Sequence, residues 1–136
     1  MIPTRRVSMI KHYLAGLALA CVLPVAMADD YTAAYGQCMD KASSTVAMSA
    51  CIGAETQVQD QRLNRVYKQL MGKLDAGQQK SLRDVQRKWL AYRDGNCQFH
   101  VQASGGTLAQ LEGGSCIMDM TRDRAAELER VLSPGQ

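Results

Sequence analysis

Apolar residues recur every three or four positions along most of the chain, a spacing typical of amphipathic helices. The clearest case is residues 82–97, where Leu82, Val85, Trp89 and Tyr92 form one stripe. Trp89 is the only tryptophan, and burial of so large a side chain would anchor a core. The pattern predicts that this helix is central and that the other helices cover it.

The same periodicity predicts three more helices, at about residues 31–41, 45–74 and 108–132. The helix that carries Trp89 extends to about Ala103. Strand-like alternation of apolar and polar residues is absent. The sequence therefore predicts an all-α fold, a small antiparallel bundle of three long helices and one short N-terminal helix.

Glycines mark two places where this helical pattern is interrupted. Ser104-Gly105-Gly106 ends the helix that carries Trp89, with glycine in its usual place after a helix. Gly113 and Gly114 fall inside the last helix, and glycine weakens a helix interior by about 1 kcal/mol relative to alanine. We therefore expect Gly113 and Gly114 to interrupt the last helix after its first two turns.

The first 28 residues have the pattern of a secretory signal peptide. A basic start, including Arg5 and Lys11, precedes an apolar run over residues 14–25 that is too short to span a bilayer. Ala26-Met27-Ala28 supplies the small residues of a cleavage site. We expect cleavage after Ala28, export to the periplasm or the exterior, and one domain over residues 29–136.

Cys21 allows a second interpretation of this leader. Together with Ala18, Leu19 and Ala20 it resembles a bacterial lipoprotein signal, in which the cysteine carries a lipid anchor. Such signals usually have leucine where Ala18 stands, so the free form is favoured over the anchored one. The chain is exported under either interpretation, and no membrane span is expected.

Removal of the leader also changes the charge of the chain. The formal net charge of +3 is accounted for by Arg5, Arg6 and Lys11, so the remaining chain is neutral. No nucleic-acid-binding motif is present, and a nucleic-acid partner is not expected. Basic residues gather between positions 62 and 93, whereas both flanking segments are acidic. Such a run is usually a solvated helix face.

Four cysteines follow the leader, namely Cys38, Cys51, Cys97 and Cys116. An even number in a short exported chain predicts two disulfides. We expect Cys38 to pair with Cys51 and Cys97 with Cys116. Each pair would join consecutive antiparallel helices at similar heights from their connecting turn.

A set of polar and aromatic residues falls on helix faces that the pattern predicts to be buried. The set comprises Asp60, Asn64, Tyr67, Gln86, Trp89, Arg93, Asp94, Thr121 and Arg124. A buried charge needs a partner, so we expect Arg93 to bond a carboxylate on another helix, with Asp60 as first candidate. Arg124 should lie close to the same cluster. The alternative is that these residues form a recognition site at the surface of the bundle.

Few residues after the leader are suited to catalysis. His100 is the only histidine after the leader, and no nucleophile, base and orienting group can be assembled around it. The cysteines lack the spacing of a zinc site. We therefore expect no enzyme, no metal site and no cofactor, with a small hydrolase as the weakest of three function classes.

These motifs resemble the lysozyme inhibitor LprI-like domain, a small exported helical domain of bacteria once classed as a domain of unknown function. The resemblance rests on these matches: Cys38; Met48-x-x-Cys51; Asp60-x-x-Leu63-Asn64-x-x-Tyr67; Leu82-x-x-x-Gln86-x-x-Trp89-x-x-Tyr92-Arg93-Asp94-x-x-Cys97; Gly105-Gly106-Thr107; Cys116; and Thr121-Arg122-x-Arg124. It covers about residues 38–132. It implies an envelope binding protein that inhibits lysozyme through reversible protein–protein contact.

The charge pattern does not add to that implication. Lysozymes of the common animal type are basic, and an acidic inhibitor would be steered toward them. The basic segment at residues 62–93 would repel such a partner, which leaves the acidic ends to steer it. The second function class is therefore a structural or stress-related envelope module that binds another bacterial protein.

If the chain is an inhibitor, it must occupy the lysozyme cleft or mask its rim, because it brings no catalytic group. The candidate binding loop is the glycine-rich connection with its neighbouring histidine: His100, Ser104, Gly105, Gly106 and Thr107. The expected Cys97–Cys116 bond would hold this loop, and pre-organisation limits the entropy lost on binding. The alternative is that Gly105 and Gly106 only end a helix.

Overall fold

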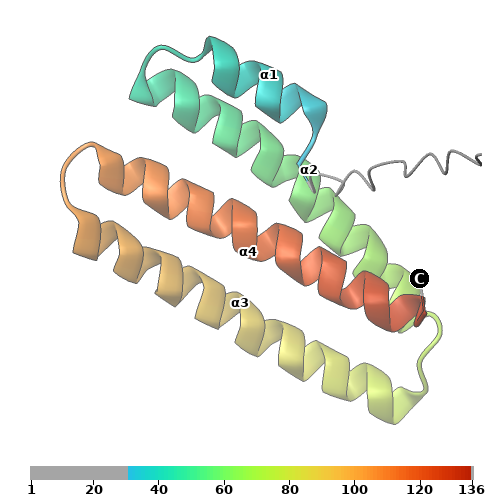
Figure 1. Ribbon diagram of the computed structural model, residues 1–136. Helices are drawn as coiled ribbons and strands as arrows, with labels where there is room; N and C mark the ends of the chain where they lie inside the picture. Colours follow the sequence, from blue (N-terminus) through green and yellow to red (C-terminus); the bar gives the residue numbers. More distant parts are fainter. Residues whose placement is uncertain (1–30, 136) are drawn as a thin grey trace, which may run out of the picture.

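The computed structural model describes residues 31–135, and this part of the chain forms four helices and no strand. They are α1 (Ala33–Lys41), α2 (Thr45–Met71), α3 (Ala76–Ser104) and α4 (Leu108–Leu132), joined by short connections (Figure 1). The predicted all-α bundle with two disulfides is confirmed. The expected signal peptide, its cleavage site and Cys21 lie outside the described residues.

The helix at the centre of the bundle is α4, not α3. α2 and α3 both pack along α4, while α1 lies against the first half of α2 (Figure 1). The expectation that the helix of Trp89 is central is therefore wrong. Cys97 is its only buried residue, and Val85 and Tyr92 are 49% and 64% exposed. Because α3 has one main neighbour, only part of its apolar stripe is covered.

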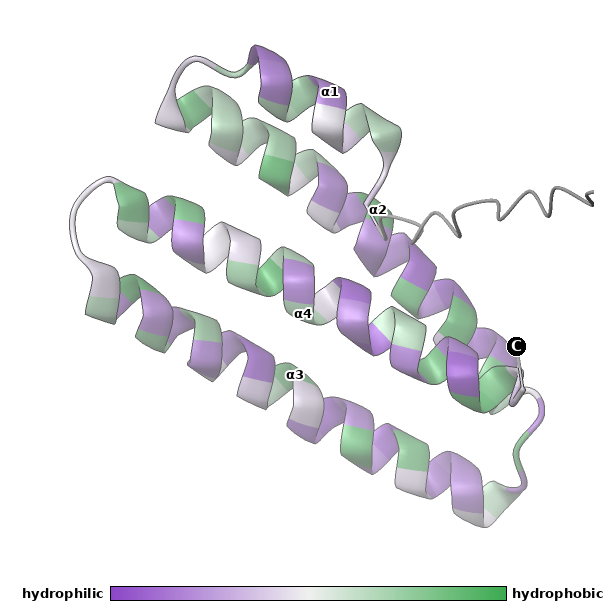
Figure 2. Cartoon of the chain, viewed as in Figure 1, coloured by the Kyte–Doolittle hydropathy of each residue, from purple (hydrophilic) through white to green (hydrophobic). Residues whose placement is uncertain are grey.

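The apolar core lies between α2 and α4. Leu63, Val66 and Leu70 of α2 pack with Ala125 and Leu128 of α4, and all five are at most 4% exposed. Partly buried apolar side chains surround this cluster, namely Tyr67, Leu74, Leu82, Trp89 and Leu132. Apolar and polar bands alternate along each long helix (Figure 2), as one-sided burial requires.

Side chains fix the starts of α2 and α3. The Ala47 N–H donates to Ser44 Oγ over 3.1 Å at the start of α2. At the start of α3 the Gln78 N–H donates to Asp75 Oδ1, and the Asp75 N–H donates to Gln78 Oε1. This reciprocal capping box satisfies two N–H groups that would otherwise lack partners. Because Asp75 caps α3, the helix begins at Ala76, and only residues 72–75 separate it from α2.

α4 runs without a break through Gly113 and Gly114, so the expected interruption is not seen. A Cβ on Gly113 would collide with Val101 of α3. A Cβ on Gly114 would lie 3.3 Å from Ile52 Cγ2 of α2. The two glycines thus let α4 approach both neighbours closely, which explains why they stand inside a helix.

Within residues 31–135, no helix combines the length and the apolar character needed to cross a bilayer.

Candidate interaction surfaces

Two disulfides clamp the bundle, in the pairing that the sequence predicts. Cys38–Cys51 joins α1 to α2 with a Cα–Cα distance of 5.7 Å. Cys97–Cys116 joins α3 to α4 with a Cα–Cα distance of 5.5 Å. Each bond lies near the connection between the two helices that it joins, so each stiffens one end of a helical hairpin.

A polar seam around Trp89 joins α3 to α4. The guanidinium carbons of Arg93 and Arg124 lie 5.2 and 5.8 Å from the centre of the Trp89 ring, within range of a cation–π attraction. Arg93 Nη1 donates to Thr121 Oγ1 over 3.2 Å. Arg93 Nε also donates to Asp94 over 2.9 Å. The seam therefore unites residues that the sequence places on separate helices.

Arg124 is the most buried charge of this seam, with 6% of the residue exposed. Its Nε donates to Gln86 Oε1 over 3.1 Å, and its Nη1 donates to Glu127 Oε2 over 2.7 Å. A buried cation without such partners would be strongly unfavourable. Six residues of the predicted network thus meet here, namely Gln86, Trp89, Arg93, Asp94, Thr121 and Arg124.

The expected ion pair between Arg93 and Asp60 is wrong. Asp60 is exposed and accepts a 2.9 Å hydrogen bond from Asn64 of its own helix. Arg93 points from α3 toward α4, where it bonds Thr121, whereas Asp60 lines a surface groove with residues from earlier turns of α3. Arg124 does lie beside Arg93, as expected.

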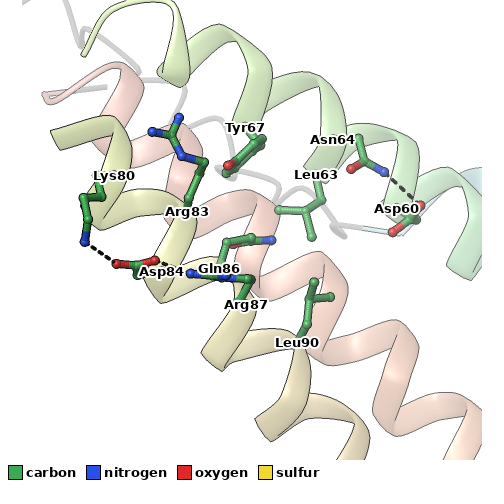
Figure 3. A pocket seen from close by; sticks show the side chains of 10 residues that line it. All are labelled: Asp60, Leu63, Asn64, Tyr67, Lys80, Arg83, Asp84, Gln86, Arg87 and Leu90. Atoms are coloured by element: carbon green, nitrogen blue, oxygen red, sulfur yellow. Dashed lines mark hydrogen bonds and ion pairs between the residues drawn. The ribbon is translucent and has the colours of Figure 1, made fainter. Parts of the chain in front are cut away.

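Asp60, Asn64 and Tyr67 instead line a groove between α2 and α3. Its volume is about 550 Å³, and Figure 3 shows its two walls. Its ten lining residues are Asp60, Leu63, Asn64, Tyr67, Lys80, Arg83, Asp84, Gln86, Arg87 and Leu90. The polar residues of the α2 motif, Asp60 and Asn64, therefore face a recess at the surface, whereas Leu63 belongs to the core and Tyr67 packs against it.

The groove has a basic α3 wall. Lys80 Nζ lies 3.2 Å from Asp84 Oδ2, and Arg87 pairs with the same carboxylate. Hydrogen bonds from Arg87 and Lys80 hold the pKa of Asp84 below its ordinary value. Arg83 adds a third cation to this wall. Since Asp60 and Asp84 are its two acids, the lining carries a net positive charge.

Two smaller recesses follow along α4 toward the α3–α4 connection. One, of about 280 Å³, lies between α2 and α4, and the other, of about 340 Å³, lies between α3 and α4. Gly114 and Ile117 line both of them. The surface is thus hollowed on both sides of α4 at Gly114, which has no side chain to fill the space.

A buried acid that the sequence does not single out fixes the start of α1. Glu55 is 2% exposed, and it accepts hydrogen bonds from the Thr32 N–H over 3.1 Å and from Gln59 Nε2 over 2.7 Å. Burial by itself raises the pKa of Glu55, but the hydrogen bonds from Thr32 and Gln59 outweigh it and lower the pKa below its ordinary value. Glu55 and Gln59 are four residues apart and therefore share one helix face, and this spacing is the sequence signal from which their contact could have been predicted.

Tyr31 ties the same end of the chain to α4. Its hydroxyl donates to Asp119, and the Arg122 guanidinium lies 4.4 Å from the centre of its ring. Burial, together with the bond to Asp119, raises the pKa of Tyr31, so the hydroxyl stays protonated. No sequence pattern links residues so far apart in the chain.

The candidate binding loop forms the exposed tip of the α3–α4 hairpin. Gly105 and Gly106 adopt φ values of 64° and 65°, a conformation that glycine adopts without strain. Ser104 donates a hydrogen bond to Glu112 of α4. Leu108, the first residue of α4, is 59% exposed.

His100 and Thr107 complete the candidate loop. His100 is exposed, and its ring packs edge-on against Phe99 with the ring centres 6.1 Å apart. Thr107 precedes α4 but makes no capping hydrogen bond through its side chain. Among residues 31–135, no three His, Cys, Asp or Glu side chains gather in a group suited to a metal ion.

Comparison with known proteins identifies one family. The family model described as "Lysozyme inhibitor LprI" matches residues 38–128. A relative from Rhizobium meliloti (strain 1021), described as an uncharacterized protein, is 28% identical over 110 residues, which cover 71% of this chain and 79% of the relative. No solved structure matches significantly.

Proposed function

Because the chain belongs to the lysozyme inhibitor LprI family, we propose that it is an exported envelope protein that binds a lysozyme reversibly and blocks its cleft. The binding element is the tip of the α3–α4 hairpin, with His100, Ser104, Gly105, Gly106 and Thr107. Its mechanism is occupancy, which requires no catalytic group and no cofactor.

The observation that supports this choice is the exposed tip clamped by Cys97–Cys116. The disulfide lies seven residues before the end of α3 and eight after the start of α4, about two turns from the tip. A loop fixed in this way loses little entropy on binding. Leu108, 59% exposed at its edge, supplies an apolar contact of the kind found at the centre of interfaces.

The test is a titration of purified lysozymes of several types with the processed, oxidised protein. We expect reversible, one-to-one inhibition of at least one type. His100→Ala and a variant with an unrelated turn in place of residues 104–108 should each weaken inhibition. Lys73→Ala, an exposed change on the opposite connection, is the matched control and should inhibit like the wild type.

Two outcomes separate the parts of this proposal. Unchanged lysozyme activity at a large molar excess, across all types, would reject the inhibitor function. Full inhibition by the protein with the unrelated turn would keep the inhibitor and reject the tip as its binding element.

The groove favours a second candidate function, an interaction module for another bacterial envelope protein. Leu63, Tyr67 and Leu90 give it an apolar lining, and its α3 wall is basic. This combination suits the apolar face of an amphipathic helix with acidic flanks. An envelope protein captured by the wild type should be lost from an Arg83→Glu, Arg87→Glu variant. It should be retained by Lys41→Glu, an exposed charge reversal on α1.

A further inference from the structure

Three sulfur atoms meet where a disulfide joins α3 to α4. Met120 stands four residues after Cys116 on α4, so the two side chains share one helix face. Met120 Sδ lies 3.7 Å from Cys97 Sγ and 3.9 Å from Cys116 Sγ. The spacing of the cysteines does not predict this cluster, because its third sulfur belongs to a methionine. Reduction of the disulfide would therefore place two thiols beside a thioether.

The distances between these sulfurs match those of a three-coordinate metal site. A metal–sulfur bond of about 2.3 Å, made at three corners of a plane, sets the sulfurs about 4 Å apart. Met120 Sδ already lies close to that distance from each cysteine sulfur. Only the cysteine sulfurs have to separate on reduction. A change of side-chain torsion is sufficient for this, because the Cα atoms of Cys97 and Cys116 are 5.5 Å apart.

Asn96 supports the cluster from the α3 side. Its Nδ2 lies 3.5 Å from Met120 Sδ and 3.6 Å from Cys116 Sγ, so its N–H groups point toward both sulfurs. Such outer contacts orient the ligands of a metal ion and tune its binding. Cys97 is 2% exposed and lines the recess of about 340 Å³ between α3 and α4. The cluster is therefore shielded by the two helices but borders a recess that opens to the surface.

We propose that, after reduction of the disulfide, Cys97, Cys116 and Met120 bind one Cu(I) ion, which links α3 to α4 in place of the S–S bond. Thiolates and thioethers are soft ligands that select Cu(I). Zn²⁺ prefers four ligands, and within residues 31–135 no His, Asp or Glu joins the two cysteines to form a metal-binding group. This site is independent of the proposed lysozyme inhibition.

The chemistry requires a dithiol reductant and no change in the oxidation state of copper. A small dithiol attacks the disulfide at Cys116, which is half-buried. The dithiol is oxidised to its own disulfide, and both cysteines of the protein become thiols. Cu(I) then displaces the two thiol protons and remains Cu(I). Binding should therefore release protons and weaken as the pH falls.

Anaerobic titration of the processed protein with Cu(I), in competition with a chromogenic chelator, tests the site. Cys38→Ser with Cys51→Ser provides a background protein with one cysteine pair. We expect this protein to bind one Cu(I) per chain when reduced and none when oxidised. Met120→Leu should raise the dissociation constant roughly tenfold or more, since even changes around a ligand set have effects of that size. Met71→Leu, half-buried at the opposite end of the bundle, is the matched control and should change nothing.

X-ray absorption separates the proposed site from a simple thiol pair. Copper in the reduced background protein should have three sulfur neighbours at about 2.3 Å, whereas copper in Met120→Leu should have two. Asn96→Ala should keep three sulfur neighbours and still bind Cu(I) more weakly, because only an outer contact is lost. Circular dichroism of the oxidised proteins checks that every variant folds.

Thermal melts test whether the ion links the two helices. Cu(I) should raise the melting temperature of the reduced background protein more than that of reduced Met120→Leu, because tighter binding to the folded state stabilises it more. Equal Cu(I) affinity with and without Met120 would overturn the proposal. So would two sulfur neighbours in both proteins, or a reduced protein whose melting temperature Cu(I) does not raise.

Discussion

α2 and α3 pack against the same helix, α4, but through contacts of different chemistry. α2 buries seven residues, among them Leu63, Val66 and Leu70, whereas α3 buries Cys97 alone. α3 is held by the Trp89 seam, by hydrogen bonds to Thr121 and Arg124, and by one disulfide. Apolar burial is the larger source of stability, so the α2–α4 pair should be the stable unit and α3 the outer layer.

An ion pair strengthens the α2–α4 side further. Arg62 Nε and Nη2 donate to the two carboxylate oxygens of Glu129 over 2.8 and 2.5 Å. This two-pronged bond is the strong form of an arginine–carboxylate pair. The hydrogen bond from Arg62 lowers the pKa of Glu129. Apolar and ionic contacts therefore act together between α2 and α4.

The largest contrast is expected from truncating one apolar residue on each of the two helices. Leu63→Ala should reduce the free energy of unfolding by about 2–5 kcal/mol, because Leu63 is only 3% exposed and its truncation opens a cavity in the core. Val85→Ala, on the outer face of α3, should stay within about 0.5 kcal/mol. Urea unfolding at low protein concentration measures both. Equal losses would show that α3 belongs to the core after all.

Removing the α3–α4 disulfide should have a somewhat smaller effect. Cys97→Ala with Cys116→Ala should cost about 3 kcal/mol, from the chain entropy of a loop of this length. Hydrogen exchange should show the α3 amides losing protection first, while α2 and α4 keep theirs. If all three helices lose protection together, α3 is not a separate outer layer. Removal of Cys38–Cys51 serves as the control and should expose α1 instead.

A substitution at Gly113 tests how closely α3 and α4 approach. Gly113→Ala should cost about 1–3 kcal/mol, because the added methyl meets Val101 and overpacking is destabilising. Gly53→Ala is the control within a helix, since nothing lies within 4 Å of the added Cβ. That control should instead stabilise the protein by about 0.5–1 kcal/mol. Thermal melts of the two variants measure both effects. Stabilisation of both variants would contradict the close approach of α3 and α4 at Gly113.

The smallest predicted effect is a loss of stability in acid. The folded-state pKa values of Glu55 and Glu129 lie below the ordinary 4.5. Both groups therefore stabilise the fold above pH 4.5, and this contribution is lost as the pH falls through their lowered pKa values. Urea unfolding between pH 7 and pH 3 should show the decline. Glu55→Gln should be less stable at pH 7 and lose less on acidification; an unaltered pH dependence would contradict the assignment.

Much of the fold could be predicted because it depends on local pattern. The three- and four-residue spacing gave the helices. Both cysteine pairs followed from their distances to the connecting turns. Gly105 and Gly106 end α3 as expected, since the left-handed backbone there suits glycine. Each of these features is set by neighbours in the sequence.

The candidate site was predicted only in part. The polar residues on α3 and α4 do meet around Trp89, but Asp60, Asn64 and Tyr67 form the wall of a groove instead. Helical spacing shows which side chains share a face of one helix, and it does not show which helix that face will meet. The contact of Thr32 with Glu55 and that of Tyr31 with Asp119 join distant residues, so no local pattern carries them.

The sequence alone determined that the chain is a helical bundle with two staples, because periodicity and cysteine spacing are local properties. Only the tertiary structure decided that α4 is the central helix. An amphipathic stripe records that a face is apolar, whereas centrality depends on how many neighbours a helix has. α4 can have two because Ala125, Gly113 and Gly114 let them approach. α3 has one, and Val85 and Tyr92 of its apolar stripe remain exposed.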